Sequence, residues 1–350
     1  MTRTIDIAGR RVGGGEPVYI VAELSANHNQ DFEEAVRLVH AAAECGADAV
    51  KLQTYTPDTL TINCDREQFR IGKGTLWEGK NLYALYAEAY TPWEWQPKLK
   101  RIANDRGLDL FSTPFDCSAV RFLEAMAVPA YKIASFELVD LALVREVAAT
   151  GKPLIMSTGM ASLGEIEEAL VAARESGAEQ IALLKCTSAY PAPPEEMNLR
   201  TIPDLMARFG VPVGLSDHTL GIAVPVAAVA LGACLIEKHF TRSRAVPGPD
   251  SAFSLEPQEF KAMVEAVRAA ERALGEATYT LTEHEVASRV FRRSLFVVKD
   301  VAAGEVLTSD NVRSIRPGMG LAPRHWPQVI GRRARRELLR GTPVDWDAID

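Results

Sequence analysis

Lysines and hydroxyl residues stand at the ends of short apolar runs along the first three quarters of this 350-residue chain. A charge among buried apolar residues costs several kcal/mol unless it is paired or functional, so these positions are informative. Ammonium and hydroxyl groups that converge can hold an anion that carries both a phosphate and a carboxylate. The residues predicted to form such an anion site are Lys51, Thr113, Lys132, Ser135, Ser157 and Ser216.

Two histidines, His218 and His239, follow the last two of these runs. If the two runs are neighbouring strands, the imidazoles can share a divalent metal ion, with Glu23 of the first run nearby. A metal ion held there would polarise a sugar carbonyl while the cations bind a phosphorylated enol. The sequence therefore predicts a metal site beside the anion site.

A Schiff-base aldolase is an alternative, because three lysines occupy run ends and any of them could supply the reactive amine. They are Lys51, Lys132 and Lys185. Borohydride trapping with a carbonyl substrate would distinguish this chemistry from the metal-assisted route.

The elements that must position these residues are eight β-rich apolar runs, which alternate with segments of helical periodicity up to about Gly275. Eight βα units of this size predict a TIM (β/α)8 barrel over residues 1–275, with all strand ends converging on one face. The long connections 54–107 and 240–255 both leave that face. The runs are residues 18–24, 48–53, 108–113, 129–135, 153–158, 181–186, 211–216 and 233–239.

A doubly wound α/β sheet is the competing architecture. Its glycine-rich turn should follow the first strand, whereas Gly13, Gly14 and Gly15 precede the first run. These glycines are instead predicted to turn a hairpin formed by residues 4–12, which plugs the bottom of the barrel.

The pattern changes after Gly275, with a linker predicted over residues 276–288 and a small β-rich domain over 289–350. Residues 299–312 resemble residues 336–349 at a spacing of 37, which indicates a pseudo-symmetric domain. Residues 289–350 hold twelve Lys or Arg against seven Asp or Glu, whereas the whole chain carries a net charge of −7. This asymmetry also favours two domains.

Several classes of protein are disfavoured by composition. The N-terminus lacks the apolar run of a signal peptide, and no stretch reaches the roughly 18 apolar residues of a membrane span. The five cysteines form no CxxC pair, as expected for buried, reduced thiols in the cytoplasm. The arginine-rich run at 332–340 lacks the aromatic interleaving of a nucleic-acid site. We expect a cytoplasmic protein that binds neither membrane nor nucleic acid.

Ten segments, in this order and spacing, resemble the sialic acid synthase family of phosphoenolpyruvate-dependent nonulosonate synthases. They are AELSANHNQ (22–30), VKLQTYTPDT (50–59), FSTPFD (111–116), YKIASFE (131–137), STGMAS (157–162), LLKCTSAYP (183–191), VGLSDHT (213–219), EKHFTRSRAVPGPD (237–250), FRRSL (291–295) and RPGMG (316–320). The resemblance covers nearly the whole chain and implies that the barrel is followed by an antifreeze-like (SAF, β-clip) domain.

The resemblance implies a C–C bond-forming transferase that condenses phosphoenolpyruvate with an open-chain sugar, using Mn²⁺ or Mg²⁺ on His218 and His239. It adds Ser188 to the phosphoenolpyruvate site named above and gives Glu23 the task of handling the attacking water. It also implies a homodimer in which Arg316 of the swapped SAF domain covers the partner's barrel. The residues expected to face the sugar are Gln53, Glu137, Tyr190, Glu237 and Asp250.

Within the family, the chain resembles the pseudaminic acid branch most. Residues 76–95, Ser25, Gln30, Phe136 and the segment DSAFSL (250–255) are similar to that branch. The expected sugar is then 2,4-diacetamido-2,4,6-trideoxy-L-altrose. N-acetylneuraminate and legionaminate synthases are the rivals within the class, and a carbohydrate-binding protein that uses the SAF-like module is a non-enzymatic rival.

Overall fold

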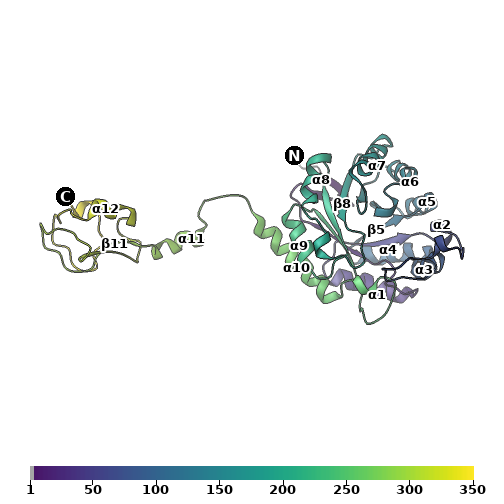
Figure 1. Ribbon diagram of the computed structural model, residues 1–350, viewed down its shortest axis with the longest axis horizontal. Coiled ribbons are helices and arrows are strands. Elements are labelled where there is room, and N and C mark those ends of the chain that lie inside the picture. Colours follow the sequence, from purple (N-terminus) through teal and green to yellow (C-terminus); the bar gives the residue numbers. More distant parts are fainter. Residues whose placement is uncertain (1–3) are drawn as a thin grey trace. The chain divides into compact units, whose positions relative to one another are not determined.

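The computed structural model describes residues 4–350 and divides into two compact units (Figure 1). The first ends at Gly275 and the second begins at Glu276. Residues 276–288, expected to be a linker, contain the short helix α11 (Glu283–Ser288). Its start is fixed by a capping box in which Thr282 and Glu285 each bond the other's backbone N–H.

The first unit is a closed barrel of eight parallel strands in the order β10-β3-β4-β5-β6-β7-β8-β9. Its strands fall on the eight apolar runs, so the predicted TIM barrel is confirmed. The closure pairs the last strand with the first and sets His239 opposite Glu23. The strands are β3 (Tyr19–Glu23), β4 (Ala49–Thr54), β5 (Asp109–Pro114), β6 (Tyr131–Ile133), β7 (Leu154–Ser157), β8 (Ile181–Cys186), β9 (Val213–Asp217) and β10 (Leu235–His239).

Helices cover the outside of the barrel (Figure 1). Their starts follow from local chemistry: the Asp31 side chain, for example, accepts the N–H of Glu33 and caps the first helix. The helices are α1 (Phe32–Glu44), α2 (Pro57–Leu60), α3 (Leu82–Ala89), α4 (Gln96–Asp105), α5 (Cys117–Ala125), α6 (Leu141–Ala148), α7 (Leu163–Glu175), α8 (Thr201–Phe209), α9 (Ala223–Ala230) and α10 (Pro257–Leu274).

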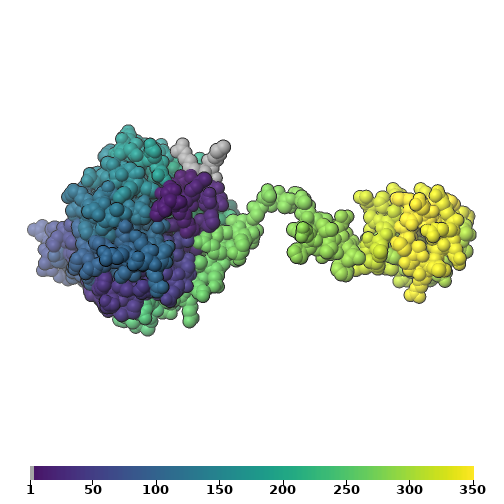
Figure 2. All heavy atoms as spheres, turned by 180° about the vertical axis from the view of Figure 1, so that it is seen from behind, coloured from purple at the N-terminus to yellow at the C-terminus, as the bar shows by residue number. Residues whose placement is uncertain are grey.

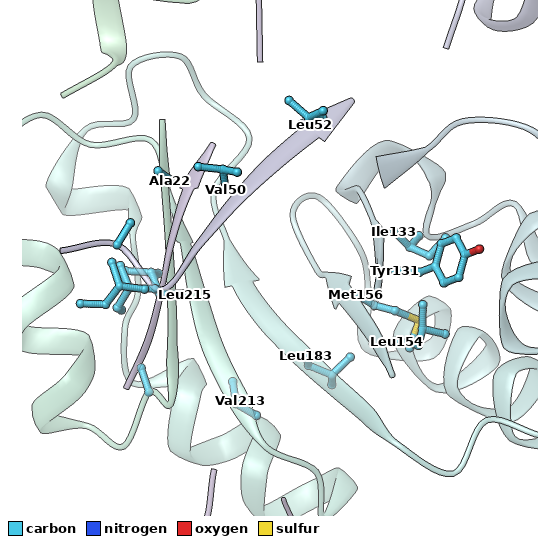
Figure 3. Packing of buried hydrophobic residues seen from close by; sticks show 14 of the residues in the cluster. Ala22, Val50, Leu52, Tyr131, Ile133, Leu154, Met156, Leu183, Val213 and Leu215 are labelled. Carbon is cyan, nitrogen blue, oxygen red and sulfur yellow. The ribbon is translucent and has the colours of Figure 1, made fainter. Parts of the chain in front are cut away.

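Alternation along the strands divides the buried apolar residues into two layers. Ala22, Val50, Leu183 and Leu215 belong to the layer between strands and helices (Figure 3). The other layer fills the lower part of the barrel interior. Its strand-derived members are Tyr19, Val21, Ala49, Phe111, Ala130, Ile155, Ala182, Leu184 and Leu235.

An antiparallel hairpin of β1 (Thr4–Ile7) and β2 (Arg10–Gly13) closes the bottom of the barrel. Its apolar side chains Ile5, Ile7 and Val12 pack with the interior layer, and Figure 2 shows the hairpin in dark purple against the barrel. The predicted turn was wrong. The hairpin turns at Ala8 and Gly9, which both have positive φ, whereas Gly13–Gly15 end β2 and lead to β3.

The second unit holds β11 (Ser294–Val297), β12 (Val312–Ile315) and α12 (Trp326–Val329) around its own apolar core. The repeat spaced by 37 residues is visible in its hydrogen bonds. Val301 and its repeat equivalent Leu338 exchange both N–H···O bonds at 2.9 Å. A residue that pairs with its own equivalent lies on a twofold axis, so the unit is pseudo-symmetric.

Within residues 4–350, no helix combines the length and the apolar character needed to cross a membrane.

Candidate active site

A ring of polar side chains lies directly above the apolar layer of the barrel interior. Each member stands two residues after an inward-facing strand position, so the same alternation that buries Val21 or Ala49 turns the polar residue inward. All eight strands contribute one member. The ring residues are Glu23, Lys51, Thr113, Lys132, Ser157, Cys186, Ser216 and Glu237, and all are buried.

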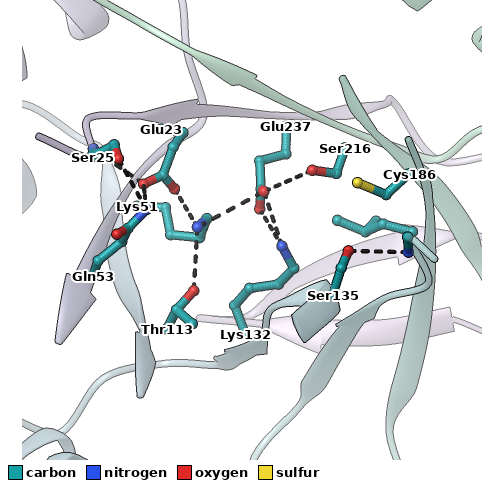
Figure 4. A network of polar contacts seen from close by, with 12 residues as sticks. Glu23, Ser25, Lys51, Gln53, Thr113, Lys132, Ser135, Cys186, Ser216 and Glu237 are labelled. Carbon is teal, nitrogen blue, oxygen red and sulfur yellow. Dashed lines mark hydrogen bonds and ion pairs between the residues drawn. The ribbon is translucent and has the colours of Figure 1, made fainter. Parts of the chain in front are cut away.

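Ion pairs connect the charged members of the ring across the barrel (Figure 4). Lys132 Nζ donates to both carboxylate oxygens of Glu237, at 2.9 and 3.1 Å, and Ser216 Oγ donates to the first of them at 3.1 Å. Lys51 pairs with Glu23, lies 3.8 Å from Glu237 Oε1 and donates to Thr113 Oγ1 at 3.2 Å. Two cations and two carboxylates therefore share one buried layer.

Burial and charge oppose each other in setting the ionisation of this layer. Burial alone would raise the pKa of Glu237, but Lys132 and Lys51 outweigh it and hold that pKa at about 2. For Lys51, the neighbouring carboxylates outweigh burial and raise the pKa. Burial raises the pKa of Glu23 despite Lys51. Glu237 therefore stays ionised, whereas Glu23, with its raised pKa, is the carboxyl better suited to exchanging a proton.

Hydroxyl groups crowd around the backbone of Gly159, after β7. Its N–H donates to Ser135 Oγ at 3.0 Å. A Cβ at this position would stand 2.3 Å from Ser188 Oγ and 2.7 Å from Ser135 Oγ, so an alanine here would displace both hydroxyls. The Ser157 hydroxyl is buried without a hydrogen-bond partner among the described residues. This cluster can donate several hydrogen bonds to an anion.

The two histidines lie side by side, with ring centroids 5.3 Å apart. His218 Nδ1 is 2.9 Å from the Thr187 carbonyl, an arrangement that leaves Nε2 with a free lone pair. His239 Nδ1 is buried with no partner within the described chain, and burial lowers the pKa of this imidazole well below its usual value. Burial alone would lower the pKa of His218, but its contact with Cys186 outweighs burial and raises that pKa. In their neutral forms both imidazoles can offer a lone pair to a metal ion, so this pair fits a divalent ion.

No group of three or more His, Cys, Asp or Glu side chains in residues 4–350 is arranged as a complete metal cage. A metal ion on His218 and His239 would therefore complete its shell with water or substrate oxygens, as catalytic metal sites do.

A third cluster joins the end of β4 to the loops after β3 and β10. Ser25 donates to Asp250. Gln53 Nε2 donates to Ser25 Oγ at 2.9 Å and to Glu23 Oε1 at 3.3 Å (Figure 4). Burial raises the pKa of Asp250. The cluster thus connects polar groups expected to face the sugar directly to the Glu23 carboxylate.

Aromatic rings line the histidine side of the site. Tyr190 lies over His218 with centroids 4.3 Å apart, and Phe253 contacts His239 at 4.9 Å. Trp77, from the long connection after β4, packs against Tyr190 at 5.8 Å and donates its indole N–H to the Pro249 carbonyl at 2.9 Å. Trp77 is therefore the residue of the segment 76–95 that packs against this aromatic cluster.

Glu137 is placed apart from the ring, in the turn after β6. Its Oε2 atom is buried without a partner among the described residues, and burial raises its pKa to about 7. Arg316 belongs to the second unit, in the loop that follows β12.

Three placements differ from what sequence reasoning anticipated. Cys186, expected to be a small apolar filler, is a ring member whose Sγ lies 3.9 Å from His218 Nδ1. Its period-2 position after Leu184 was the missed signal. Lys185 turns its Nζ to the Cys186 carbonyl at 2.7 Å and stays outside the ring, which weakens its case as a Schiff-base amine. Glu237, expected to face the sugar, is bound to the predicted anion-site residues.

Comparison with known proteins identifies the family. The model of the NeuB family matches residues 38–279, and that of the SAF domain matches residues 292–350. The chain belongs to the NeuB family. The resemblance predicted from the ten segments is therefore confirmed, as are the enzyme class and the barrel followed by an SAF domain.

Relatives of this NeuB-family chain share most of its length. It is similar to the pseudaminic acid synthase of Helicobacter pylori, with 46% identity over 96% of this chain and 98% of the relative. It is 47% identical to the pseudaminic acid synthase of Campylobacter jejuni serotype O:23/36, over 92% and 93% of the two chains. The solved N-acetylneuraminic acid synthetase of Leptospira borgpetersenii aligns at TM-score 0.73 with 32% identity, over 82% of this chain and 95% of that one.

Proposed function

We propose that this chain is a pseudaminic acid synthase, which condenses phosphoenolpyruvate with 2,4-diacetamido-2,4,6-trideoxy-L-altrose and water to give pseudaminic acid and phosphate. One observation carries the choice of sugar: two pseudaminic acid synthases are 46% and 47% identical to the chain over more than nine tenths of its length. The wall formed by Trp77, from residues that resemble the same branch, supports it.

The ring supplies the binding of phosphoenolpyruvate. Lys51 and Lys132 present their charges beside the hydroxyls of Thr113 and Ser216, and the hydroxyl cluster around Gly159 adds hydrogen-bond donors. Charge-assisted hydrogen bonds of this kind are strong in a buried layer because the local dielectric is low. The phosphate and carboxylate of the substrate are thereby held while its C3 carbon faces the sugar.

The reaction then proceeds in balanced steps. The C3 carbon of phosphoenolpyruvate attacks the aldehyde carbon, the new C–C bond forms, the aldehyde oxygen takes up a proton to become a hydroxyl, and positive charge develops at C2. Water adds to C2 and Glu23 takes one of its protons. The C–O bond to phosphate then breaks, phosphate leaves with the bonding electrons, and the remaining C2 hydroxyl loses its proton to give the ketone. The raised pKa of Glu23 makes it a stronger base than an ordinary carboxylate.

His218 and His239 would hold Mn²⁺ or Mg²⁺, which would polarise the sugar aldehyde. On the same face, Gln53, Asp250 and Tyr190 orient the open-chain sugar against these histidines.

We further propose that the working form is a cytoplasmic homodimer in which the SAF domain of one subunit covers the barrel mouth of its partner and supplies Arg316. Each unit exposes large apolar side chains that suit such a contact: Phe136 and Met160 on the barrel loops, and Phe291 and Met319 in the SAF unit. Mixing inactive Arg316→Ala and Glu23→Gln subunits should restore activity, because heterodimers contain one intact composite site. No recovery would contradict the shared site.

The sugar assignment is tested by incubating the full chain with phosphoenolpyruvate, Mn²⁺ and one sugar at a time. The sugars are the L-altro diacetamido sugar, the diacetamido precursor of legionaminic acid and N-acetylmannosamine. Phosphate release and product mass confined to the L-altro sugar are expected. Preference for another sugar would change the branch, and no phosphate from any sugar would refute the synthase.

A further inference from the structure

A buried ion pair lies directly behind the two histidines, on the outer side of the strands. Lys238 of β10 is opposite Asp217 of β9 in the strand register, and both side chains are 0% exposed. The preceding outward positions, Ile236 and Leu215, belong to the apolar layer under the helices. In such a layer, the mutual attraction of two charges rarely offsets the free energy that their desolvation costs. The pair therefore calls for an explanation other than stability.

The contacts of the ion pair involve the residues directly before and after His218. Lys238 Nζ donates to the Asp217 carboxylate and to the Thr219 carbonyl. Asp217 accepts the Thr219 N–H at 2.9 Å and its hydroxyl at 3.1 Å. The residues on both sides of His218 are thus bound to each other and to Lys238, which directly precedes His239.

Each histidine also has anchors of its own. The His218 carbonyl accepts the Ala192 N–H at 3.0 Å, and the His239 carbonyl accepts the Leu255 N–H at 2.9 Å. These bonds tie each histidine to a different loop. The Lys238 ammonium, in contrast, joins the two histidine-bearing segments to each other.

We propose that Lys238 and Asp217 are positioning residues that set the separation of the two imidazoles for a shared divalent ion. This inference rests on the metal site of the proposed function. The pair touches neither metal nor substrate and acts through the backbone on either side of His218 and before His239. Partners that orient metal ligands typically change metal affinity by about 10–100-fold when removed.

The test measures Mn²⁺ binding to the full chain, with MnCl₂ as the probe and the electron paramagnetic resonance signal of free Mn²⁺ as the readout. The main variant is Lys238→Met with Asp217→Asn, which removes both charges and keeps an oxygen for the Thr219 N–H. Asp217→Asn alone is the second variant: it removes the carboxylate charge and keeps the Lys238 bond to the Thr219 carbonyl. Thermal unfolding establishes that each variant is folded.

Two controls define the baseline. His218→Ala should abolish the Mn²⁺ binding of the wild type. Thr54→Val changes a fully buried side chain at the end of β4, which bonds Gln96 and Ser112 and touches neither histidine segment. It should leave Mn²⁺ affinity unchanged.

We expect Mn²⁺ affinity to fall at least about 10-fold in the folded double variant and by a smaller factor in Asp217→Asn. Wild-type affinity in a folded double variant would overturn the inference and leave the metal site intact. If the double variant does not fold, the Mn²⁺ affinity of Asp217→Asn is compared with that of the wild type instead. A wild type that fails to bind Mn²⁺, or that binds it equally after His218→Ala, would refute the metal site and this inference with it.

Discussion

Replacing Glu237 by glutamine removes one negative charge from a buried layer that holds two carboxylates and two ammonium groups. Glu237 contacts Lys132 through both oxygens, accepts from Ser216 and lies 3.8 Å from Lys51 Nζ. Glutamine keeps the shape and one acceptor oxygen. The change therefore isolates the charge of this carboxylate from its volume.

Two opposite effects follow from the geometry. Breaking one partner of a buried ion pair costs about 3–5 kcal/mol, and the retained amide places the expected loss of unfolding free energy near about 3 kcal/mol. Affinity for an anion should rise, because the attraction between Lys51 and the Glu237 carboxylate 3.8 Å away, about 4 kcal/mol at an effective dielectric constant of about 20, competes with the attraction of Lys51 for the anion. If one third of this energy becomes available for binding the anion, the affinity rises about tenfold.

The assay titrates inorganic phosphate into wild type and Glu237→Gln by calorimetry and follows urea unfolding of both. Glu88→Gln, at an exposed ion pair with Lys80, is the matched control and should change neither quantity measurably. Because Lys132 and Lys51 hold the pKa of Glu237 at about 2, the stability advantage of wild type is present above pH 4.5 and fades as pH falls towards 2. Unchanged or weaker phosphate binding in Glu237→Gln would refute the electrostatic reasoning.

Further predictions concern the hydroxyl cluster, a buried carboxyl and the metal. Gly159→Ala should raise the KM for phosphoenolpyruvate at least about tenfold, because the new methyl group would stand 2.3 Å from Ser188 Oγ. Gly164→Ala, whose methyl group would meet no atom within 4 Å, should leave this KM unchanged. An equal KM in the two variants would contradict the role of the hydroxyl cluster around Gly159. Burial raises the pKa of Glu137 to about 7, so the folded state keeps its proton longer than the unfolded state. The contribution of this carboxyl to the free energy of unfolding is fully present below pH 4.5 and is lost as pH rises through 7. Urea titrations at several pH values should therefore show wild type losing about 3 kcal/mol relative to Glu137→Gln over this range. Parallel pH profiles of unfolding free energy for the two proteins would argue against the raised pKa. Removing metal with a chelator should abolish turnover, added Mn²⁺ should restore it in wild type but not in His239→Ala, and full turnover in metal-free buffer would exclude the metal.

The sequence by itself determined the barrel and most of the chemistry at its mouth. Eight apolar runs of strand length, separated by helical segments, leave few architectures that bury every run on both faces. Lys51 and Lys132 were recognisable as site residues because burying a charged side chain at the end of such a run costs free energy unless the charge is paired or functional. Period-2 alternation also determines that Cys186 faces inward, although composition alone suggested an inert thiol.

Only the tertiary structure decided which of these groups meet. Lys132 and Glu237 are 105 residues apart, on strands that are not neighbours, and they form a pair because the closed barrel brings their inward positions across its interior. The pairing of Asp217 with Lys238 depends likewise on the register between two strands. Residue types and local periodicity specify which face a side chain occupies, whereas register and closure, set by packing of the whole chain, specify its partner.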